Sequence, residues 1–262
     1  MDSVSNASYA SDHYAFLQHL HERLRPEVYL ETGVEHGSTL QLAQAQAIGI
    51  DPQPQLTVAL RENMCIYEQT SDDFFASHEV FGLTGHRPID LAFIDGLHLF
   101  EAALNDFINI ERYSHAGTVV CIHDVLPSTV KMAARDPQPD GWTGDVFGLV
   151  LALREHRPDL FSATIDVPDT GMLVLSNLDP ANTTLRDRYP QILAQHMAID
   201  YARIHEHRNA VFDLVPYSEA IVDFLVESME VSRARARVRS ACDFLNGEPR
   251  VRLGDSRLAS VR

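Results

Sequence analysis

The chain has 262 residues, a formal net charge of −16 at neutral pH and a hydrophobic content of 45%. These values suffice for one large α/β domain with an appended segment, whereas the acidic excess argues against nucleic acid as a partner. Three scattered cysteines lack metal or redox spacing and the longest apolar runs are only strand-sized, so we expect a cytoplasmic protein with reduced thiols and no membrane partner.

In chain order, helices and strands are predicted to alternate. Strands are indicated by short apolar runs rich in β-branched or aromatic residues, and helices by apolar side chains at helical spacing. The predicted order is helix Asp12–Leu24, strand Val28–Thr32, helix Ser38–Ala45, strand Ala47–Ile50, helix Leu56–Asn63, strand Cys65–Gln69, a helix opened by Ser71, strand Ile89–Ile94, helix Phe100–Tyr113 and strand Thr118–Ile122. This alternation predicts βαβ units and a parallel sheet.

The second half of the chain differs in pattern. A polar loop at Pro127–Gly141 is long enough to form a lid or substrate loop, and a helix is predicted at Trp142–His156. Two further strands, Phe161–Val167 and Met172–Leu178, flank a turn sequence and predict an antiparallel hairpin at the edge of the sheet.

These elements predict an α/β fold of the Rossmann-like, doubly wound type, with seven mostly parallel strands in residues 1–180. A helical C-terminal extension is predicted over residues 181–262, with amphipathic stretches at Tyr189–His205 and Ser218–Val238. Exposed apolar faces on these helices would suit a homodimer. We interpret the arginine run at 233–239 as a solvated face or a protein contact.

The loop after the first strand is predicted to bind a nucleotide-like ligand, because the carboxyl ends of strands in an open α/β sheet form such a site. Its glycines let the backbone turn and approach a ligand. Glu31 within this loop would repel a pyrophosphate and tolerate a cation, so S-adenosylmethionine fits better than NAD, and Asp51 suits a ribose diol. The predicted donor contacts are Glu31, Thr32, Gly33, Gly37, Ser38, Asp51, Ser71, Asp72 and Asp95. The alternatives are a structural glycine turn and, for Ser71 and Asp72, simple helix capping.

Acidic and imidazole groups follow the fourth and fifth strands. Asp95 follows the fourth strand, and His123 and Asp124 follow the fifth, so the tips lie about 5 Å apart if these strands are neighbours. Asp95 and Asp124 could share a hard divalent cation such as Mg²⁺, which would lower the pKa of a bound hydroxyl. His98 could face the same cleft and take the hydroxyl proton. Asp95 and His98 are therefore the predicted catalytic residues.

Each of these groups also has a simpler interpretation. Asp95 could serve merely as a turn and helix cap. His98 could pack under the following helix, and His123 and Asp124 could form a hydrogen-bonded loop pair. Weaker candidates for the substrate pocket or the donor loop are Trp142, Asp145, Asp166, Glu35 and His36.

Five segments carry a resemblance to a known family: ETGVEHGST (Glu31–Thr39), IGIDPQ (Ile48–Gln53), TSDDFF (Thr70–Phe75), DLAFIDGLHLFEAALNDF (Asp90–Phe107) and GTVVCIHD (Gly117–Asp124). They resemble class I S-adenosylmethionine-dependent methyltransferases, and more narrowly the branch of macrolide-sugar O-methyltransferases and cephalosporin-hydroxylase-like proteins. The likeness covers residues 28–125 and continues more weakly to residue 180. The segment IDGxH followed by HD is its most specific part.

The resemblance implies donor contacts among the loop residues named above, Mg²⁺ bound by Asp95 with acids at the end of the fifth strand, and His98 as the base. His123 departs from the pattern, since it stands where some relatives have a second acid. A histidine ligand would favour a transition metal. The metal ligands expected from this resemblance are Asp95, His123 and Asp124.

We therefore expect an S-adenosylmethionine-dependent enzyme that methylates a hydroxyl of a small molecule, such as a natural product or a sugar, with assistance from a divalent metal. Two alternatives stay open. One is a metal-independent N- or C-methyltransferase, and the other is a non-catalytic homologue whose helical tail recruits a partner protein. No motif in the sequence identifies the methyl acceptor.

Overall fold

The structure is a computed structural model, and it describes residues 13–139 and 141–230. The strands in chain order are β1 (Val28–Thr32), β2 (Gln46–Ile50), β3 (Met64–Tyr67), β4 (Leu91–Ile94), β5 (Val119–His123), β6 (Phe161–Asp166), β7 (Met172–Ser176) and β8 (Leu214–Pro216). The helices are α1 (His13–Leu24), α2 (Ser71–Ser77), α3 (Val80–Leu83), α4 (Phe100–Glu111), α5 (Phe147–His156), α6 (Thr184–Asp187), α7 (Tyr189–His196), α8 (Ala202–His205) and α9 (Arg208–Phe212), with a 3₁₀ turn η1 at Leu40–Leu42. Residues 219–230 form a further helical segment. The predicted arginine run at 233–239 lies outside the described residues.

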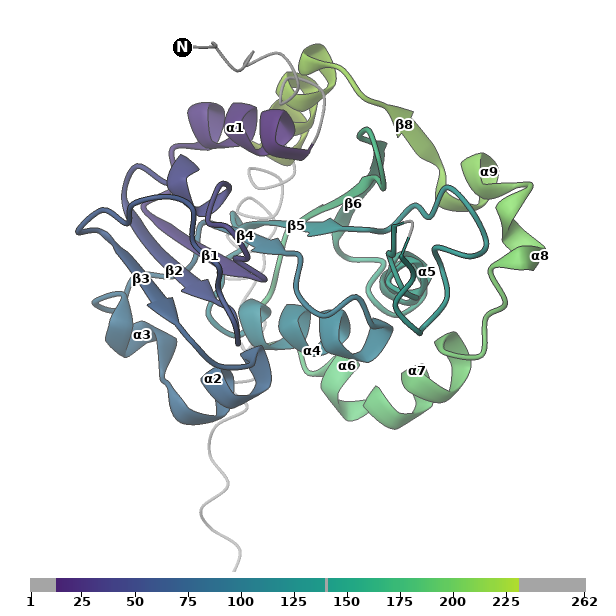
Figure 1. Cartoon of the computed structure of the whole chain (residues 1–262), viewed down its shortest axis with the longest axis horizontal. Coiled ribbons are helices and arrows are strands. Elements are labelled where there is room, and N and C mark those ends of the chain that lie inside the picture. The colour runs from purple at the N-terminus through teal and green to yellow at the C-terminus, as the bar shows by residue number, and fades with distance from the viewer. Residues whose placement is uncertain (1–12, 140, 231–262) are drawn as a thin grey trace, which may run out of the picture.

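The strands form one sheet in the order β3-β2-β1-β4-β5-β7-β6-β8 (Figure 1). Strands β1 to β5 pair in parallel, as predicted, and β7 is antiparallel to both β5 and β6. The sequence led us to expect seven strands with the hairpin at the edge, and this is wrong in one respect. A short eighth strand, β8, pairs in parallel with β6 and forms the edge beyond the hairpin.

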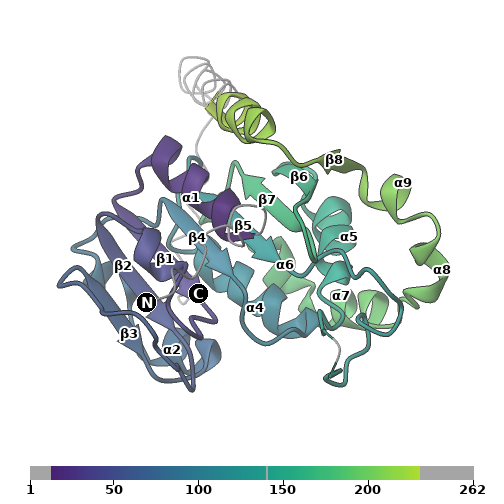
Figure 2. The same ribbon diagram turned by 45° about the horizontal axis from the view of Figure 1, so that its top comes forward.

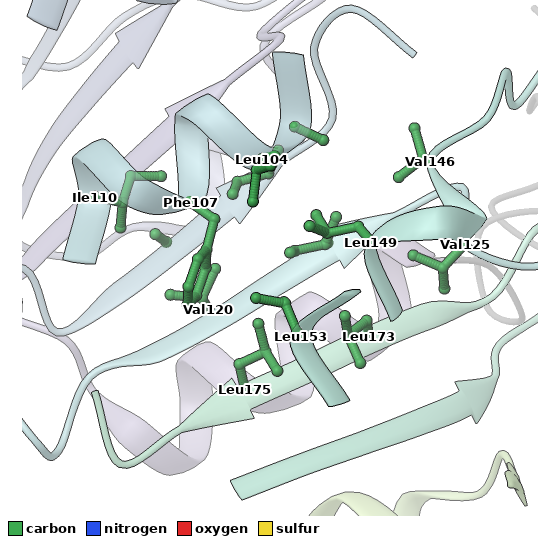
Figure 3. Packing of buried hydrophobic residues seen from close by; sticks show 14 of the residues in the cluster. Leu104, Phe107, Ile110, Val120, Val125, Val146, Leu149, Leu153, Leu173 and Leu175 are labelled. Carbon is green, nitrogen blue, oxygen red and sulfur yellow. The ribbon is translucent and has the colours of Figure 1, made fainter. Parts of the chain in front are cut away.

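The central strands are buried on both faces, which explains their nearly continuous apolar sequences. One apolar cluster lies between the sheet and helices α2 to α7, and Leu104, Phe107, Leu149 and Leu153 meet β5 and β7 there (Figure 3). The second cluster, on the opposite face, is covered by α1 and η1. The sheet is therefore the middle layer of three, and its loops lie at the two remaining edges.

The chain beyond residue 180 is integrated into this architecture. The helical segment 219–230 lies beside α1 (Figure 2), and its Val222 and Met229 join the same apolar cluster as Phe16 of α1. Asp223 accepts hydrogen bonds from His19 and Arg23 of α1 at 3.0 and 2.8 Å. Within the described ranges, none of the helices combines the length and the apolar composition that crossing a membrane requires.

Several predicted helices differ from the structure. The stretch Ser38–Ala45 contains only the η1 turn, and Leu56–Asn63 is not helical. Backbone hydrogen bonds at the start of the latter stretch instead join it to the loop after β1, from Gln55 N to the Glu35 carbonyl and from Thr57 N to the His36 carbonyl. Helix α5 begins at Phe147, later than expected, and the amphipathic stretch Tyr189–His205 is divided between α7 and α8.

Candidate active site

The ends of four parallel strands bring the predicted site residues to one edge of the sheet. In the register of the sheet, Thr32 lies opposite both Ile50 and Ile94, and Ile94 lies opposite Ile122. The residues that follow these positions therefore leave the sheet side by side. They are Gly33, Asp51, Asp95 and His123.

Gly33 is in direct backbone contact with the end of β4. Its φ of +83° is a conformation that favours glycine, and its N–H donates to the carbonyl of Ile50 at 2.9 Å. A Cβ atom at this position would lie 2.0 Å from the carbonyl oxygen of Asp95. Any side chain here would push the donor loop away from Asp95, so glycine is required by both conformation and space.

Asp51 follows β2 and is held against the glycine loop that follows β1. Its two carboxylate oxygens accept hydrogen bonds from the backbone N–H groups of Glu35 and Gln53, each at 2.8 Å. Each oxygen keeps a free lone pair, so the carboxylate can still accept from a ligand hydroxyl. The nearby Gly37 also has a positive φ, of +79°, and a Cβ there would lie 2.8 Å from the Val58 side chain.

Glu31 lies beneath the loop and has no exposed surface. It accepts hydrogen bonds from the hydroxyls of Thr39 at 2.6 Å and Tyr29 at 2.7 Å. Burial raises the pKa of Glu31 to about 8, although both hydroxyls oppose this shift. Thr39 thus binds this carboxyl group and does not cap a helix, which is one reason that the predicted helix from Ser38 is absent. Ser38 itself is exposed.

The loop after β3 places Ser71 and Asp72 at the start of α2, where Thr70 rather than Ser71 is the capping residue. Ser71 is half-buried and Asp72 is exposed. Beneath them lies Asp106, which sequence reasoning missed. Burial raises the pKa of Asp106 to about 6, against the opposing effect of the Ser71 hydroxyl, and its Oδ1 has no hydrogen-bond partner among the described residues. The signal in the sequence was an acid on the buried face of α4.

Asp95, His98 and Asp124, which we call the strand-tip cluster, offer three ligand atoms within 4.8 Å of one another. Nε2 of His98 lies 3.0 Å from Oδ2 of Asp124 and 3.7 Å from Oδ1 of Asp95. Asp124 has a φ of +60°, a costly conformation for a residue with a side chain. Strain of this kind is common at functional sites, although it does not by itself assign a function.

His123 lies behind the cluster and does not belong to the group of three. Its Nδ1 donates to Oδ1 of Asp95 at 3.1 Å, and its Nε2 lies 3.1 Å from the hydroxyl of Thr170 in the turn between β6 and β7. Burial alone would lower the pKa of His123, but the charge and hydrogen bond of Asp95 raise it to about 9. In return, burial would raise the pKa of Asp95, yet His123 holds it below its ordinary value.

His98 is oriented by the loop that precedes α5. Its Nδ1 donates to the backbone carbonyl of Trp142 at 2.8 Å, and the Trp142 ring lies 5.2 Å from the imidazole. Gly144 packs so closely that a Cβ would lie 1.6 Å from the His98 carbonyl oxygen. Because Nδ1 donates to this carbonyl, Nε2 is the nitrogen that faces Asp95 and Asp124 and that would receive a substrate proton or bind a metal there.

The weaker candidates have other roles. Asp145 accepts from the backbone N–H of Phe100 at 2.8 Å and pairs with Arg135, so it caps α4. Asp166 is exposed at the end of β6, and His36 binds the carbonyl of Gln55. Sequence reasoning also missed Thr170 and His13, whose ring lies 4.4 Å from that of His123. Both come from distant segments that only the folded sheet brings to this edge.

Comparisons with known proteins give both a sequence match and a fold. Residues 14–125 match a family model described as a methyltransferase domain. No curated protein sequence matches the chain.

The SAH-bound methyltransferase PaMTH1 from Podospora anserina is similar with a TM-score of 0.50 and 13% identity, over 64% of this chain and 78% of that one. The O-methyltransferase TomG from Streptomyces achromogenes, which is involved in tomaymycin synthesis and is in complex with SAM, is similar with a TM-score of 0.50 and 18% identity, over 68% and 82%. At these identities the two solved structures share the fold of this chain.

Proposed function

We propose that this chain, a class I S-adenosylmethionine-dependent methyltransferase, transfers the methyl group of its donor to a hydroxyl of a small molecule. The donor would lie across the ends of β1, β2 and β3, with its ribose at Asp51 and its adenine near Ser71 and Asp72. The observation that carries the proposal is the contact between Gly33 and Asp95. It places the donor loop directly against the cluster that would activate the acceptor.

His98 is the residue that best fits the base. In the reaction the hydroxyl oxygen forms a bond to the donor methyl carbon, the bond from that carbon to sulfur breaks, and the sulfur keeps the electron pair. The hydroxyl proton moves to Nε2 of His98. The Trp142 carbonyl, which accepts from Nδ1, and the carboxylates of Asp95 and Asp124 would stabilise the resulting imidazolium.

The strand-tip cluster also suits a divalent cation. Two carboxylates and one imidazole nitrogen form a mixed oxygen and nitrogen donor set, and the hydrogen bond from Nδ1 to a carbonyl is a usual outer contact of a metal-binding histidine. Asp95, His98 and Asp124 would hold such an ion, with His123 binding Asp95 from behind. When bound, it would lower the pKa of the acceptor hydroxyl.

A metal-independent enzyme is the second candidate. It is favoured by the pairing of both carboxylates with imidazoles, at 3.0 Å for Asp124 and 3.1 Å for Asp95. This arrangement compensates the buried charges without an ion. Activity that survives thorough chelation would support this version of the proposal.

The first test is donor binding, followed by turnover. We expect calorimetric titration to show one S-adenosylmethionine bound per chain, and a methyl-labelled donor to yield methyl ethers from a panel of hydroxylated small molecules. Mass spectrometry and NMR of the products would identify the methylated atom. Products methylated only on nitrogen or carbon would contradict hydroxyl transfer, and failure to bind the donor would contradict the proposal as a whole.

A further inference from the structure

A second group of histidines and an acid lies outside the candidate active site. Helices α5 and α7 both end in histidine, His156 and His196, and Glu155 precedes His156. We call these three residues the helix-end cluster. Their ligand atoms lie within 4.8 Å of one another, and the two imidazole rings are 5.6 Å apart at an angle of 79°. The cluster shares no residue with the strand-tip cluster.

Three of the four imidazole nitrogens of this cluster lack a hydrogen bond within residues 13–139 and 141–230. The side chains of His156 and His196 are only 5% and 3% exposed. Nε2 of His156 and both ring nitrogens of His196 have no partner among the described residues. Burial of an unpaired polar nitrogen is costly. Three orphan nitrogens next to one carboxylate therefore indicate a missing partner at this place.

The distances indicate what kind of partner is missing. Glu155 oxygens lie 3.9 Å from Nε2 of His156 and 3.7 Å from Nε2 of His196, which is too long for hydrogen bonds. Ligand atoms bound tetrahedrally to one zinc ion at about 2.0–2.2 Å would be roughly 3.3–3.5 Å apart. The two distances involve different oxygens of Glu155, and the three ligand atoms lie within 4.8 Å of one another, so the side chains would draw closer together to share one ion.

We propose that Glu155, His156 and His196 bind a zinc-type divalent cation that joins α5 to α7. Two imidazoles and one carboxylate form a donor set that zinc accepts readily, whereas Mg²⁺ and Ca²⁺ prefer oxygen ligands. Gln195 donates to both oxygens of Glu155, at 2.9 and 2.8 Å, and thereby orients the carboxylate. The exposed side of Glu155 leaves room for a water molecule as the fourth ligand.

The role of this ion would be structural. Helices α5 and α7 both follow residues 14–125, which match the methyltransferase family model, and both contribute to the apolar cluster on one face of the sheet. Bound zinc would hold the two together and would stabilise only the folded chain, because the three ligands converge only there. The site is independent of the proposed catalytic function.

The test uses the full-length protein stripped of metal. We would titrate Zn²⁺ against a competing chromophoric chelator and record the visible spectrum of the Co²⁺ derivative. Variants would be His196→Gln and Glu155→Gln, with His207→Gln as the matched control because His207 is exposed. A His98→Gln variant separates any metal bound at the strand-tip cluster.

We expect wild type, His207→Gln and His98→Gln to retain one Zn²⁺ equivalent that His196→Gln lacks, and a four-coordinate Co²⁺ spectrum that His196→Gln loses. Glu155→Gln should bind this equivalent at least about tenfold more weakly. Because the Glu155 side chain is half-exposed, this variant should fold even if His196→Gln does not. Equal Zn²⁺ binding by wild type and Glu155→Gln, or an equal loss in His207→Gln, would overturn the proposal.

Discussion

The strand-tip cluster and the helix-end cluster both combine carboxylates with imidazoles, but their histidines differ in hydrogen bonding. At the strand tips, His98 is held between Asp124 and the Trp142 carbonyl, and His123 is paired with Asp95. At the helix ends, three buried imidazole nitrogens have no hydrogen-bond partner in the part of the chain that the structure describes. The pKa values differ accordingly. Asp95 raises the pKa of His123 to about 9, whereas burial lowers the pKa of His196.

This difference shows that the role of a histidine is set by what its two nitrogens contact. A carbonyl on one nitrogen and a carboxylate on the other produce a polarised group suited to proton transfer. Two neighbouring imidazoles whose nitrogens mostly lack a partner among the described residues produce a site suited to a borderline cation. The predictions below test this separation, beginning with the largest expected effect.

Replacement of His98 should lower the rate of methyl transfer without weakening donor binding. We expect His98→Gln to lower kcat/KM by about 10²- to 10⁴-fold, because the base is lost. The donor dissociation constant should change little, since His98 does not belong to the donor loop. His196→Gln, which lacks the proposed zinc ion, should keep kcat/KM close to that of zinc-loaded wild type. Steady-state kinetics and calorimetry measure the two quantities, and similar activity losses in both variants would contradict the separation of the clusters.

Gly33→Ala should disrupt the contact between the donor loop and the strand-tip cluster. We expect a loss of about 1–3 kcal/mol in the free energy of unfolding from the positive φ alone. Donor binding should fall below detection, because the new Cβ would displace Asp95.

Gly82→Ala is the matched control. Gly82 lies in α3 with nothing within 4 Å of its added Cβ, so this variant should be stabilised by about 0.5–1 kcal/mol. Chemical denaturation and calorimetry would check both, and undiminished donor binding by Gly33→Ala would argue against the proposed donor site.

The raised pKa of Glu31 should make the free energy of unfolding depend on pH. Its folded pKa of about 8 lies above the ordinary 4.5, so the folded chain binds more protons than the unfolded chain between these values. Glu31 therefore makes the free energy of unfolding fall as pH rises from about 4.5 to 8. Glu31→Gln mimics the neutral acid and should flatten this fall. Urea denaturation at several pH values measures the slope, and an unchanged slope would mean that Glu31 is ionised in the folded chain.

Ser71→Ala should have the smallest effect. Loss of one hydrogen bond at the adenine edge would weaken donor affinity by about 0.5–1.5 kcal/mol, or roughly two- to tenfold. Ser77→Ala on the same helix is the control, because its hydroxyl contacts the Asp73 and Phe74 carbonyls and Nδ1 of His78 at the opposite end of α2. Calorimetric donor titration compares the two. Equal affinities would leave Ser71 as a helix-opening residue only.

Much of the sheet could be predicted because burial on both faces leaves a clear signal. The apolar runs of β1, β4 and β5 matched the structure to within two residues, and Gly33 and Gly37 indicated the turn that follows β1. The short strand β8 carries no comparable signal, since three residues hold too little information. The predicted helix at 56–63 failed because Leu56 and Leu60 have no apolar surface to cover and stay exposed.

The residues of the candidate site could be predicted from the sequence, but which histidine contacts which carboxylate could not. Asp95, His98 and Asp124 follow strand ends in the sequence, and topology brings them together. The sequence could not show that His98 would face both carboxylates while His123 binds Asp95 from behind, because this depends on the Trp142 carbonyl and on Thr170. Those partners come from loops whose positions are fixed only by tertiary packing.

Strand β8 has a practical consequence for anyone shortening this protein. A fragment ending near residue 180 would leave β6 as an open border, with unpaired N–H and C=O groups that invite pairing with neighbouring molecules. It would also lack Val222 and Met229, which pack in the same apolar cluster as Phe16 and Leu20 of α1. Such a fragment would keep every strand-tip residue and still be prone to aggregate. The residues after 180 therefore protect the edge of the sheet.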